Sequence, residues 1–566
     1  MKILSRHIYI IALVLIFVST LSCNEQAFLE EKPESFFVLE TAYQNFEQFE
    51  SALYDLYARL RATTYGGGGI SANWAMFQWT GTDAFYNGRF DNSTSRFADY
   101  QQVYIDGFGY VSDLWRNYYK IVTNANTLLD RLQGSELTAN EKSLIEAEAK
   151  FFRAFAYRYL VYHYGGVPLV INEITGPTTD FTRASKQDIL NQMVTDFTDA
   201  ANNLPGITEV QDGRLHNLVA QHYLAETHIA LGQWNEAITA ASVVINDPNT
   251  GLMTERFGSL ASDDRGNPYW DLFRLGNQNR STGNTEAIWV AQMETDIQGG
   301  FLLTGGGAGI NPFEGYHASL IWIQLDPDGN PATLGPRSTF NVGGRGINLL
   351  SMTEWVEQEL WGADYDIDER SLNINLWRDY YYDNPESPYF MESFADFPPE
   401  PTHPFAIQPY LTKVTVAGQH PESLYANKET LVLSSGAGST YRDQYYVRLP
   451  ETYLLRAEAY VGLGDNSSAA ADVNVIRARS SATLALASEV DLDYILDERV
   501  RELSLEEPRR LTLHRTGKLV ERVRAHNPFN ADDIQDHHSL MPIPLSDIEA
   551  NIDAVLEQNP GYGGAN

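Results

Sequence analysis

The sequence predicts a mainly α-helical protein, with a scaffold of tetratricopeptide-like helical hairpins and a large loop-rich insertion that carries a few short strands. A pattern of small residues around a Leu-Gly pair, Ala-Glu-x4-Leu-Gly-x4-Ala, occurs at 225–237 and again at 457–469. Small residues at these positions let two antiparallel helices approach closely, as in stacked helical repeats. The stretch between the copies, 247–443, is rich in Gly, Pro, Asp, Asn and aromatic residues. Loops of that length are usually functional.

Hydrophobic periodicity predicts the other elements. Helices are expected over 39–61 and 115–132, and helix–turn–helix units over 216–246 and 453–479, around the two repeated patterns. Short apolar runs at Ala287–Val290 and Tyr445–Leu449 are expected to be strands.

One further helix has clear signals at both ends. Thr138 and Glu141 have capping-box spacing, in which each side chain accepts from the free amide of the other residue. Apolar residues then keep helical spacing from Ile145 to Tyr162. The glycines at 165–166 and Pro168 end the helix.

The only cysteine of the 566 residues, Cys23, directly follows an apolar run near the N-terminus. Lys2 and Arg6 precede the run Ile8–Val18, which is too short to span a membrane and is typical of a secretory signal peptide. A cysteine at the cleavage point can be acylated, and several acyl chains together hold a protein on a bilayer. We therefore expect a lipid anchor on Cys23.

The expected organisation follows from these features. Residues 1–22 are expected to be a lipoprotein signal peptide and 23–246 an N-terminal helical region. Residues 247–443 are expected to form the insertion, and 444–566 a C-terminal helical region.

Composition excludes several classes of function. The formal net charge of −34 argues against nucleic acid as a partner and lowers the expectation of a polyanionic ligand. Because the single cysteine is the expected lipidation site, no cysteine remains to act as a nucleophile or zinc ligand. Apolar residues make up 43% of the chain and aromatic residues 12%, enough for a large core.

Charged clusters are interpreted as structural. Glu498, Glu502 and Glu506 share a helix face, with Arg499 and Arg509 as expected ion-pair partners, although paired carboxylates can also cleave glycosidic bonds. The charged residues of the stretch 448–458 are interpreted in the same way.

No metal site is expected. The pair His537-His538 lies near three aspartates, but no known metal-binding motif surrounds it. The run Asp326–Asn330 resembles a turn, because the glutamate that would complete a calcium loop is absent. No motif predicts a cofactor.

Four blocks of sequence suggest a family. The run 148–157, continued to 169, resembles the core helix of the SusD/RagB family of outer-membrane nutrient-binding lipoproteins, and 448–459 resembles a second signature. The stretch 498–515 resembles a third, with Glu507, Arg510 and Thr512 in place of the usual glycine, tryptophan and aspartate. The C-terminal ending, Met541–Pro544 and Gln558–Tyr562, also matches.

This resemblance implies four tetratricopeptide-like helix pairs with a loop-rich subdomain on top. It also implies a lipid-anchored protein at the outer surface of the outer membrane. Members of this kind act with a TonB-dependent, SusC-like barrel as transport partner, to which they deliver oligosaccharides or, less often, peptides.

Aromatic residues next to polar ones make the candidate glycan site. Flat sugar faces stack on aromatic rings, while sugar hydroxyls need Asp, Asn or Arg as partners. The first group of candidates is Trp74, Trp79, Asp83, Tyr86, Asn87 and Arg89, and the insertion adds Trp270, Tyr316 and Trp322. The alternative for the first group is that its rings pack the loop onto the scaffold.

The function expected from the sequence is non-catalytic capture of an oligo- or polysaccharide, neutral in charge, and its delivery to the SusC-like barrel. Two alternatives remain at this point. One is a glycoside hydrolase on a helical scaffold, and the other is an adaptor that binds only peptides or proteins.

Overall fold

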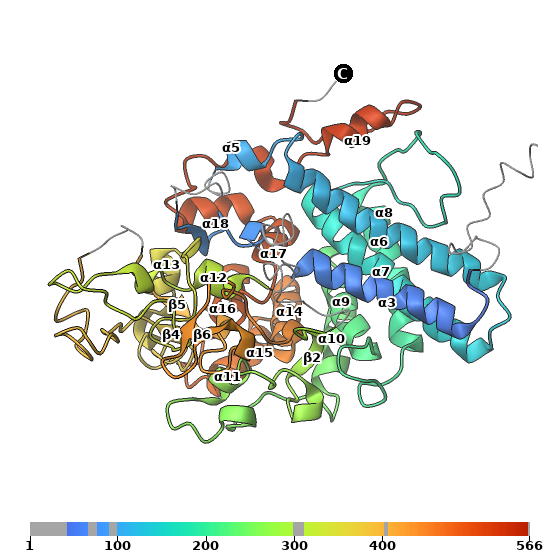
Figure 1. Cartoon of the computed structure of the whole chain (residues 1–566). Helices are drawn as coiled ribbons and strands as arrows, with labels where there is room; N and C mark the ends of the chain where they lie inside the picture. Colours follow the sequence, from blue (N-terminus) through green and yellow to red (C-terminus); the bar gives the residue numbers. More distant parts are fainter. Residues whose placement is uncertain (1–41, 66–75, 90–98, 298–310, 401–405, 564–566) are drawn as a thin grey trace, which may run out of the picture.

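The protein is mainly helical, as predicted. A computed structural model describes residues 42–65, 76–89, 99–297, 311–400 and 406–563. Figure 1 shows the long helices α3, α6, α7 and α8 on one side, the yellow and orange loops of the insertion on the other, and the C-terminal helices between them. The long N-terminal helices are α3 (Phe46–Thr64), α6 (Gly109–Gln133), α7 (Ala139–Tyr164) and α8 (Lys186–Asn203).

The remaining helices are shorter. Those in the first half of the chain are α5 (Tyr100–Val103), α9 (Asn217–Ala230), α10 (Trp234–Ile245), α11 (Pro268–Asp271) and α12 (Phe313–His317). Those in the second half are α13 (Glu354–Glu357), α14 (Leu449–Leu463), α15 (Asn466–Arg479), α16 (Leu492–Leu503), α17 (Arg509–Thr516), α18 (Leu519–His526) and α19 (Leu545–Ala550).

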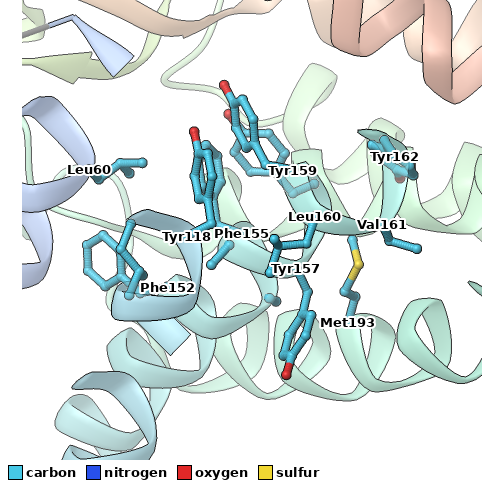
Figure 2. Close-up of a cluster of buried hydrophobic side chains, with 14 of the residues drawn as sticks. Leu60, Tyr118, Phe152, Phe155, Tyr157, Tyr159, Leu160, Val161, Tyr162 and Met193 are labelled. Atoms are coloured by element: carbon cyan, nitrogen blue, oxygen red, sulfur yellow. The ribbon is translucent and has the colours of Figure 1, made fainter. Parts of the chain in front are cut away.

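Helix α7 lies at the centre of the main core. The capping box predicted for Thr138 and Glu141 is present, and the helix ends at Gly165. Almost every residue from 145 to 164 is buried, because α6 and α8 pack along α7, and α3 and α17 also contact it. Figure 2 shows Tyr157 and Tyr159 pointing to opposite sides of this helix. The ring of Tyr159 stacks on Tyr118 of α6, with 4.3 Å between ring centroids.

The two repeated sequence patterns form helical hairpins, α9–α10 and α14–α15, as predicted. They pack on each other through α10 and α14. A Cβ atom on Gly462 would lie 2.5 Å from the ring of Trp234, so only glycine allows this close approach. Stacked hairpins are compatible with the expected tetratricopeptide-like arrangement.

Short strands hold the insertion together. They are β1 (Phe85–Asn87), β2 (Ala287–Ala291), β3 (Leu350–Met352), β4 (Leu376–Trp377), β5 (Tyr410–Leu411), β6 (Tyr425–Asn427), β7 (Val432–Leu433) and β8 (Gln444–Arg448). The two predicted strands, β2 and β8, pair with each other in antiparallel fashion. The pairs β1–β3, β4–β5 and β6–β7 are also antiparallel. A second hydrophobic core lies in this half and includes Trp79, Phe85, Val500 and Leu505, so the insertion packs on distant parts of the chain.

Element boundaries differ in places from the prediction. Within the described residues α3 begins at Phe46 rather than Leu39, because the side chain of Asn45 accepts from the amide of Gln48 and caps the helix there. Helix α6 begins at Gly109, before the first periodic residue used to predict it. Helix α8 was not predicted, although Ser185 caps it by accepting from the amide of Asp188.

Among the described residues, none of the helices has the length and hydropathy that a membrane span requires. Cys23 and the expected signal peptide lie outside the described residues.

Candidate functional site

The predicted glycan site centres on a region that we call the β1–β3 platform: the buried strands β1 and β3 with α12 and the short 3-10 helix η4 (Ile321–Ile323). Tyr86 pairs in register with Ser351, and the two strands come very close just beyond this pair. A Cβ atom on Gly88 would lie 2.1 Å from the hydroxyl of Ser351, so glycine is needed there. Trp74 lies outside the described residues.

Trp79 and Asp83 are buried, which corrects the prediction that they contact a ligand. The indole of Trp79 is 2% exposed and packs edge-on against Phe85, with 5.2 Å between ring centroids. Asp83 is fully buried and accepts from Arg509 at 2.9 and 2.5 Å and from Arg522 at 2.7 Å. The alternative interpretation, that this segment packs onto the scaffold, therefore describes both residues.

The charge state of Asp83 follows from these contacts. Burial alone raises the pKa of a carboxyl group, but the guanidinium groups of Arg509 and Arg522 outweigh it. The pKa of Asp83 is therefore held well below its usual range, and the carboxylate is permanently charged at neutral pH. Its two partners are on α17 and α18, so Asp83 fastens the N-terminal loop to the C-terminal helices.

Tyr86 and Asn87 are also buried, whereas Arg89 is half-buried. The ring of Tyr86 stacks on Phe529, with ring centroids 3.8 Å apart and planes 16° from parallel. The side-chain oxygen of Asn87 accepts from the backbone amide of Arg89 at 2.9 Å. Burial, followed by the nearby carboxyl group of Glu357, raises the pKa of Tyr86 to about 12. Of these residues, only Arg89 is partly exposed.

Trp270 is fully buried, which corrects its assignment to a second wall of the site. The guanidinium of Arg274 lies 4.5 Å from the centre of its ring, and Phe340 packs beside it at 5.6 Å. Helix α11 holds Trp270 inside the insertion, so its ring is part of a local core rather than a surface.

Tyr316 and Trp322 are the predicted aromatic residues that are only partly buried, and both pack against the second core. Tyr316 lies on α12 and Trp322 on η4. The indole N–H of Trp322 donates to the backbone carbonyl of Gly346 at 2.7 Å, which fixes the ring while part of it faces solvent. Tyr316, Trp322 and Arg89 therefore remain the candidates for ligand contact.

Two residues of this region were missed by sequence reasoning. Phe529 is 44% exposed, and it extends the stack that begins with Tyr86. Glu357 ends α13, where burial, followed by repulsion from Glu354, raises its pKa to about 8. At neutral pH its carboxyl group keeps its proton and can both donate and accept a hydrogen bond. The only signal for Phe529 was an aromatic residue after Pro528, and Glu357 gave no signal.

The charged run on α16 forms buried ion pairs, which confirms its structural interpretation. Glu502 accepts from Arg448 at 2.9 Å, from Arg479 at 2.5 Å and from Arg370 at 3.0 Å. Glu498 is also fully buried, and although burial opposes ionisation, arginines including Arg370 lower its pKa to about 2. These carboxylates have no exposed surface, so they are closed to a substrate.

The partners of the two expected arginines differ from the prediction. Arg499 pairs with Glu451 at 2.7 Å and with Glu507, while Arg509 binds Asp83. Burial raises the pKa of both glutamates despite the attraction of Arg499, and a neighbouring carboxylate adds to it, Glu226 for Glu451 and Glu451 for Glu507.

Two other expectations concern metals. Within the described part of the chain, no group of three or more His, Cys, Asp or Glu side chains is placed to hold a metal ion. The run at 326–330 is a turn in which the carboxylate of Asp326 accepts from the backbone amides of Asp328 and Asn330, at 3.0 and 2.8 Å.

Comparison with known proteins gives the family. The model of the SusD family matches residues 341–562, and a second family model, described as "Starch-binding associating with outer membrane", matches residues 27–223. The chain belongs to the SusD/RagB family. It is 26% identical to SusD-like protein P25 of Formosa agariphila, over 98% of this chain and 99% of that protein. It is also 25% identical to a SusD-like protein of Bacteroides ovatus, over 54% of each chain.

Solved SusD-like structures share the fold. A laminarin-binding SusD-like protein superposes with a TM-score of 0.64 at 20% identity, covering 92% of this chain and 100% of that chain. Surface glycan-binding protein A from Bacteroides thetaiotaomicron, solved in complex with laminarihexaose, gives a TM-score of 0.66 at 18% identity, covering 91% and 99%. At these identities the likeness establishes the SusD-like architecture of this chain.

Proposed function

We propose that this SusD/RagB protein binds a neutral oligo- or polysaccharide at the cell surface, without catalysis, and delivers it to a SusC-like TonB-dependent barrel. The observation that carries the proposal is the partly exposed indole of Trp322, fixed by its hydrogen bond to Gly346, on the β1–β3 platform. Tyr316 and Arg89 supply a second ring and a planar donor near the same strands. Solved relatives whose names include laminarin and laminarihexaose support a glycan as the ligand.

The same reasoning favours binding over hydrolysis. A glycosidase needs two carboxyl groups that reach the scissile bond from either side. Glu498 and Glu502, the strongest candidates in the sequence, are buried in ion pairs with arginines. Release of reducing sugar from a bound polysaccharide would favour the hydrolase alternative instead.

Calorimetry with neutral hexasaccharides tests the proposal. Laminarihexaose, maltohexaose and cellohexaose are titrated into the mature protein, and binding to at least one of them is expected. Trp322→Ala should weaken that binding by about 1–3 kcal/mol, the usual loss for a central aromatic anchor. Tyr460→Ala is the matched control, because Tyr460 is a half-buried tyrosine in the α14–α15 hairpin, away from the platform strands in the fold. Absence of binding to any glycan of a wider neutral panel would contradict the proposal.

The anchor and the partner have separate tests. Cys23→Ala should release the protein from the membrane fraction and abolish its labelling by a radioactive fatty acid. Protease treatment of intact cells should degrade the anchored wild-type protein, because it faces outward. The barrel should copurify with the wild-type protein from detergent extracts, and its absence there would contradict the delivery step.

A further inference from the structure

A deep cleft opens beside α3, between this helix, the segment 205–214 and strand β2. Its volume is about 660 Å³. Pockets for small ligands typically measure about 300–1,000 Å³, so the cleft has the size of a binding site. None of the residues predicted from the sequence to contact a glycan lines it.

Arg214 organises one wall of the cleft. It donates from Nε to Glu148 at 2.9 Å and also lies 3.4 Å from a carboxylate oxygen of Glu50. Its guanidinium lies 5.1 Å from the ring centre of Tyr54 and 5.6 Å from that of Tyr57. These contacts hold both rings against one fixed planar group.

The two tyrosines have different roles in this wall. The hydroxyl of Tyr57 donates to Glu148 at 2.7 Å and accepts from the amide of Leu215 at 2.9 Å, so this ring is locked in place. Tyr54, in contrast, is 53% exposed, so its ring is accessible to a ligand. The floor is also aromatic, since Trp289 stacks on Tyr446 with 4.1 Å between ring centroids.

The charges of the cleft disfavour an anionic ligand. Its two arginines already have acceptors: Arg214 binds carboxylates, and Arg61 donates to the backbone carbonyl of Gln292 at 3.0 Å. Four acidic residues line the cleft, so they outnumber the arginines; they are Glu50, Glu148, Glu209 and Asp212. Rings combined with oriented amides and carboxylates, without an available cation, suit a neutral polyhydroxyl compound.

A second cavity of about 430 Å³ adjoins the cleft and shares Arg214 and Trp289 with it. The segment that separates the two cavities includes Gly213, whose φ of +83° favours glycine. A Cβ atom there would lie 2.7 Å from the side chain of Gln292. The segment between the two cavities therefore depends on glycine at position 213. Together the two cavities have room for a ligand longer than a single sugar ring.

We propose that the α3 cleft is a second sugar-binding site, which takes a short neutral stretch of glycan with Tyr54 as its stacking ring. Gln211, exposed at the rim, supplies a side-chain amide to the hydroxyls, whereas the side-chain amide of Gln292 already donates to Asn279 at 2.9 Å. The choice of a sugar as ligand rests on the proposed function, whereas the residues are separate from those of the platform.

Single and double variants distinguish the two sites. Wild-type protein, Tyr54→Ala, Trp322→Ala and the double variant are titrated with laminarihexaose, maltohexaose and cellohexaose, and with the parent polysaccharide of whichever binds. We expect two binding sites per wild-type molecule, with Tyr54→Ala weakening one at least five-fold and Trp322→Ala weakening only the other. Tyr54→Phe is the matched control, since it keeps the ring and should bind within two-fold of wild type.

Each outcome has a distinct meaning. If Tyr54→Ala and Gln211→Ala both bind as wild type does while Trp322→Ala loses binding, the inference is wrong and the proposed function stands. If Tyr54→Ala removes all binding and Trp322→Ala none, the cleft binds sugar and the platform does not. If wild-type protein binds no neutral glycan, both are wrong. Thermal unfolding of each variant shows that lost binding is not lost structure, because Tyr54 and Gln211 are exposed.

Discussion

The segment 76–89 and the α3 cleft both combine aromatic rings with arginines and carboxylates, but they differ in what these groups contact. In the segment, Asp83 is enclosed by two arginines and Trp79 is covered by the second core. In the cleft, Arg214 is paired yet partly exposed, and Tyr54 faces solvent. The same residue types therefore build an interior joint in one place and an open surface in the other. Exposure to solvent, rather than residue type, therefore distinguishes a structural contact from a candidate binding site.

Asp83→Asn should have the largest effect on stability. The change removes the charge that balances Arg509 and Arg522, both of which stay buried. Breaking such a buried pair typically costs about 3–5 kcal/mol, and two arginines are affected here. Urea unfolding measures the change. Asp366→Asn is the matched control, because Asp366 is 78% exposed beside Arg378 and should cost about 0–1 kcal/mol. Equal losses in both variants would contradict the buried joint.

Trp79→Ala should destabilise the protein by about 3–4 kcal/mol, because it leaves a cavity in the second core. At a temperature where the variant is fully folded, its affinity for glycan should match that of wild type. Calorimetry below the unfolding transition checks this. A selective loss of glycan binding in a folded Trp79→Ala protein would show that Trp79 contributes to the binding site rather than only to the second core.

Arg214→Met should cost about 1–3 kcal/mol, less than Asp83→Asn, since it leaves the buried Glu148 without its cation. Burial already raises the pKa of Glu148, and losing Arg214 should raise it further. The variant should also lose binding in the α3 cleft, because Tyr54 loses the guanidinium that positions it. Unfolding and titration of the same sample test both effects, and Arg116→Met is an exposed control.

Glu357→Gln should give an effect that depends on pH and that is smallest at acidic pH. Its pKa in the folded protein, about 8, lies above the ordinary value for glutamate. Its contribution to stability is therefore fully present at pH below that ordinary value and is lost as the pH rises through 8. Glu357→Gln cannot ionise, so its stability should rise relative to wild type between pH 5 and 8. Parallel stability curves for the two proteins would show that Glu357 ionises normally; Glu422→Gln is the exposed control.

The sequence predicted the helical half of this fold better than the insertion. Capping boxes and helical spacing are local, so the helix after Thr138 and both hairpins were identified correctly. The strand pair β1–β3 joins residues more than 260 positions apart, and a short apolar run in the sequence does not indicate which strand it pairs with. Likewise, the fully buried state of Asp83 depends on Arg509 and Arg522, which no local pattern connects to it.

Candidate sites were harder to predict for the same reason. The sequence shows that the segment 76–89 is rich in aromatic residues. Whether each ring faces inward depends on distant residues, as Phe529 shows for Tyr86. The α3 cleft is built from five stretches of chain that are separated in sequence, so it gave no local signal. The sequence predicted that the charged residues of α16 form ion pairs. It did not predict which residues pair, because that depends on the tertiary structure.

Glu502 of α16 is bound by arginines from three separate stretches: Arg370 in the insertion, Arg448 at the end of β8 and Arg479 at the end of α15. A chimera could combine the insertion of a relative with α16 of this chain. If that insertion lacked an arginine equivalent to Arg370, Glu502 would be buried without one of its three cations. Recombination of the insertion with that of a relative is therefore expected to yield a folded protein only where this junction stays intact. Arg370 and α16 should accordingly be exchanged together.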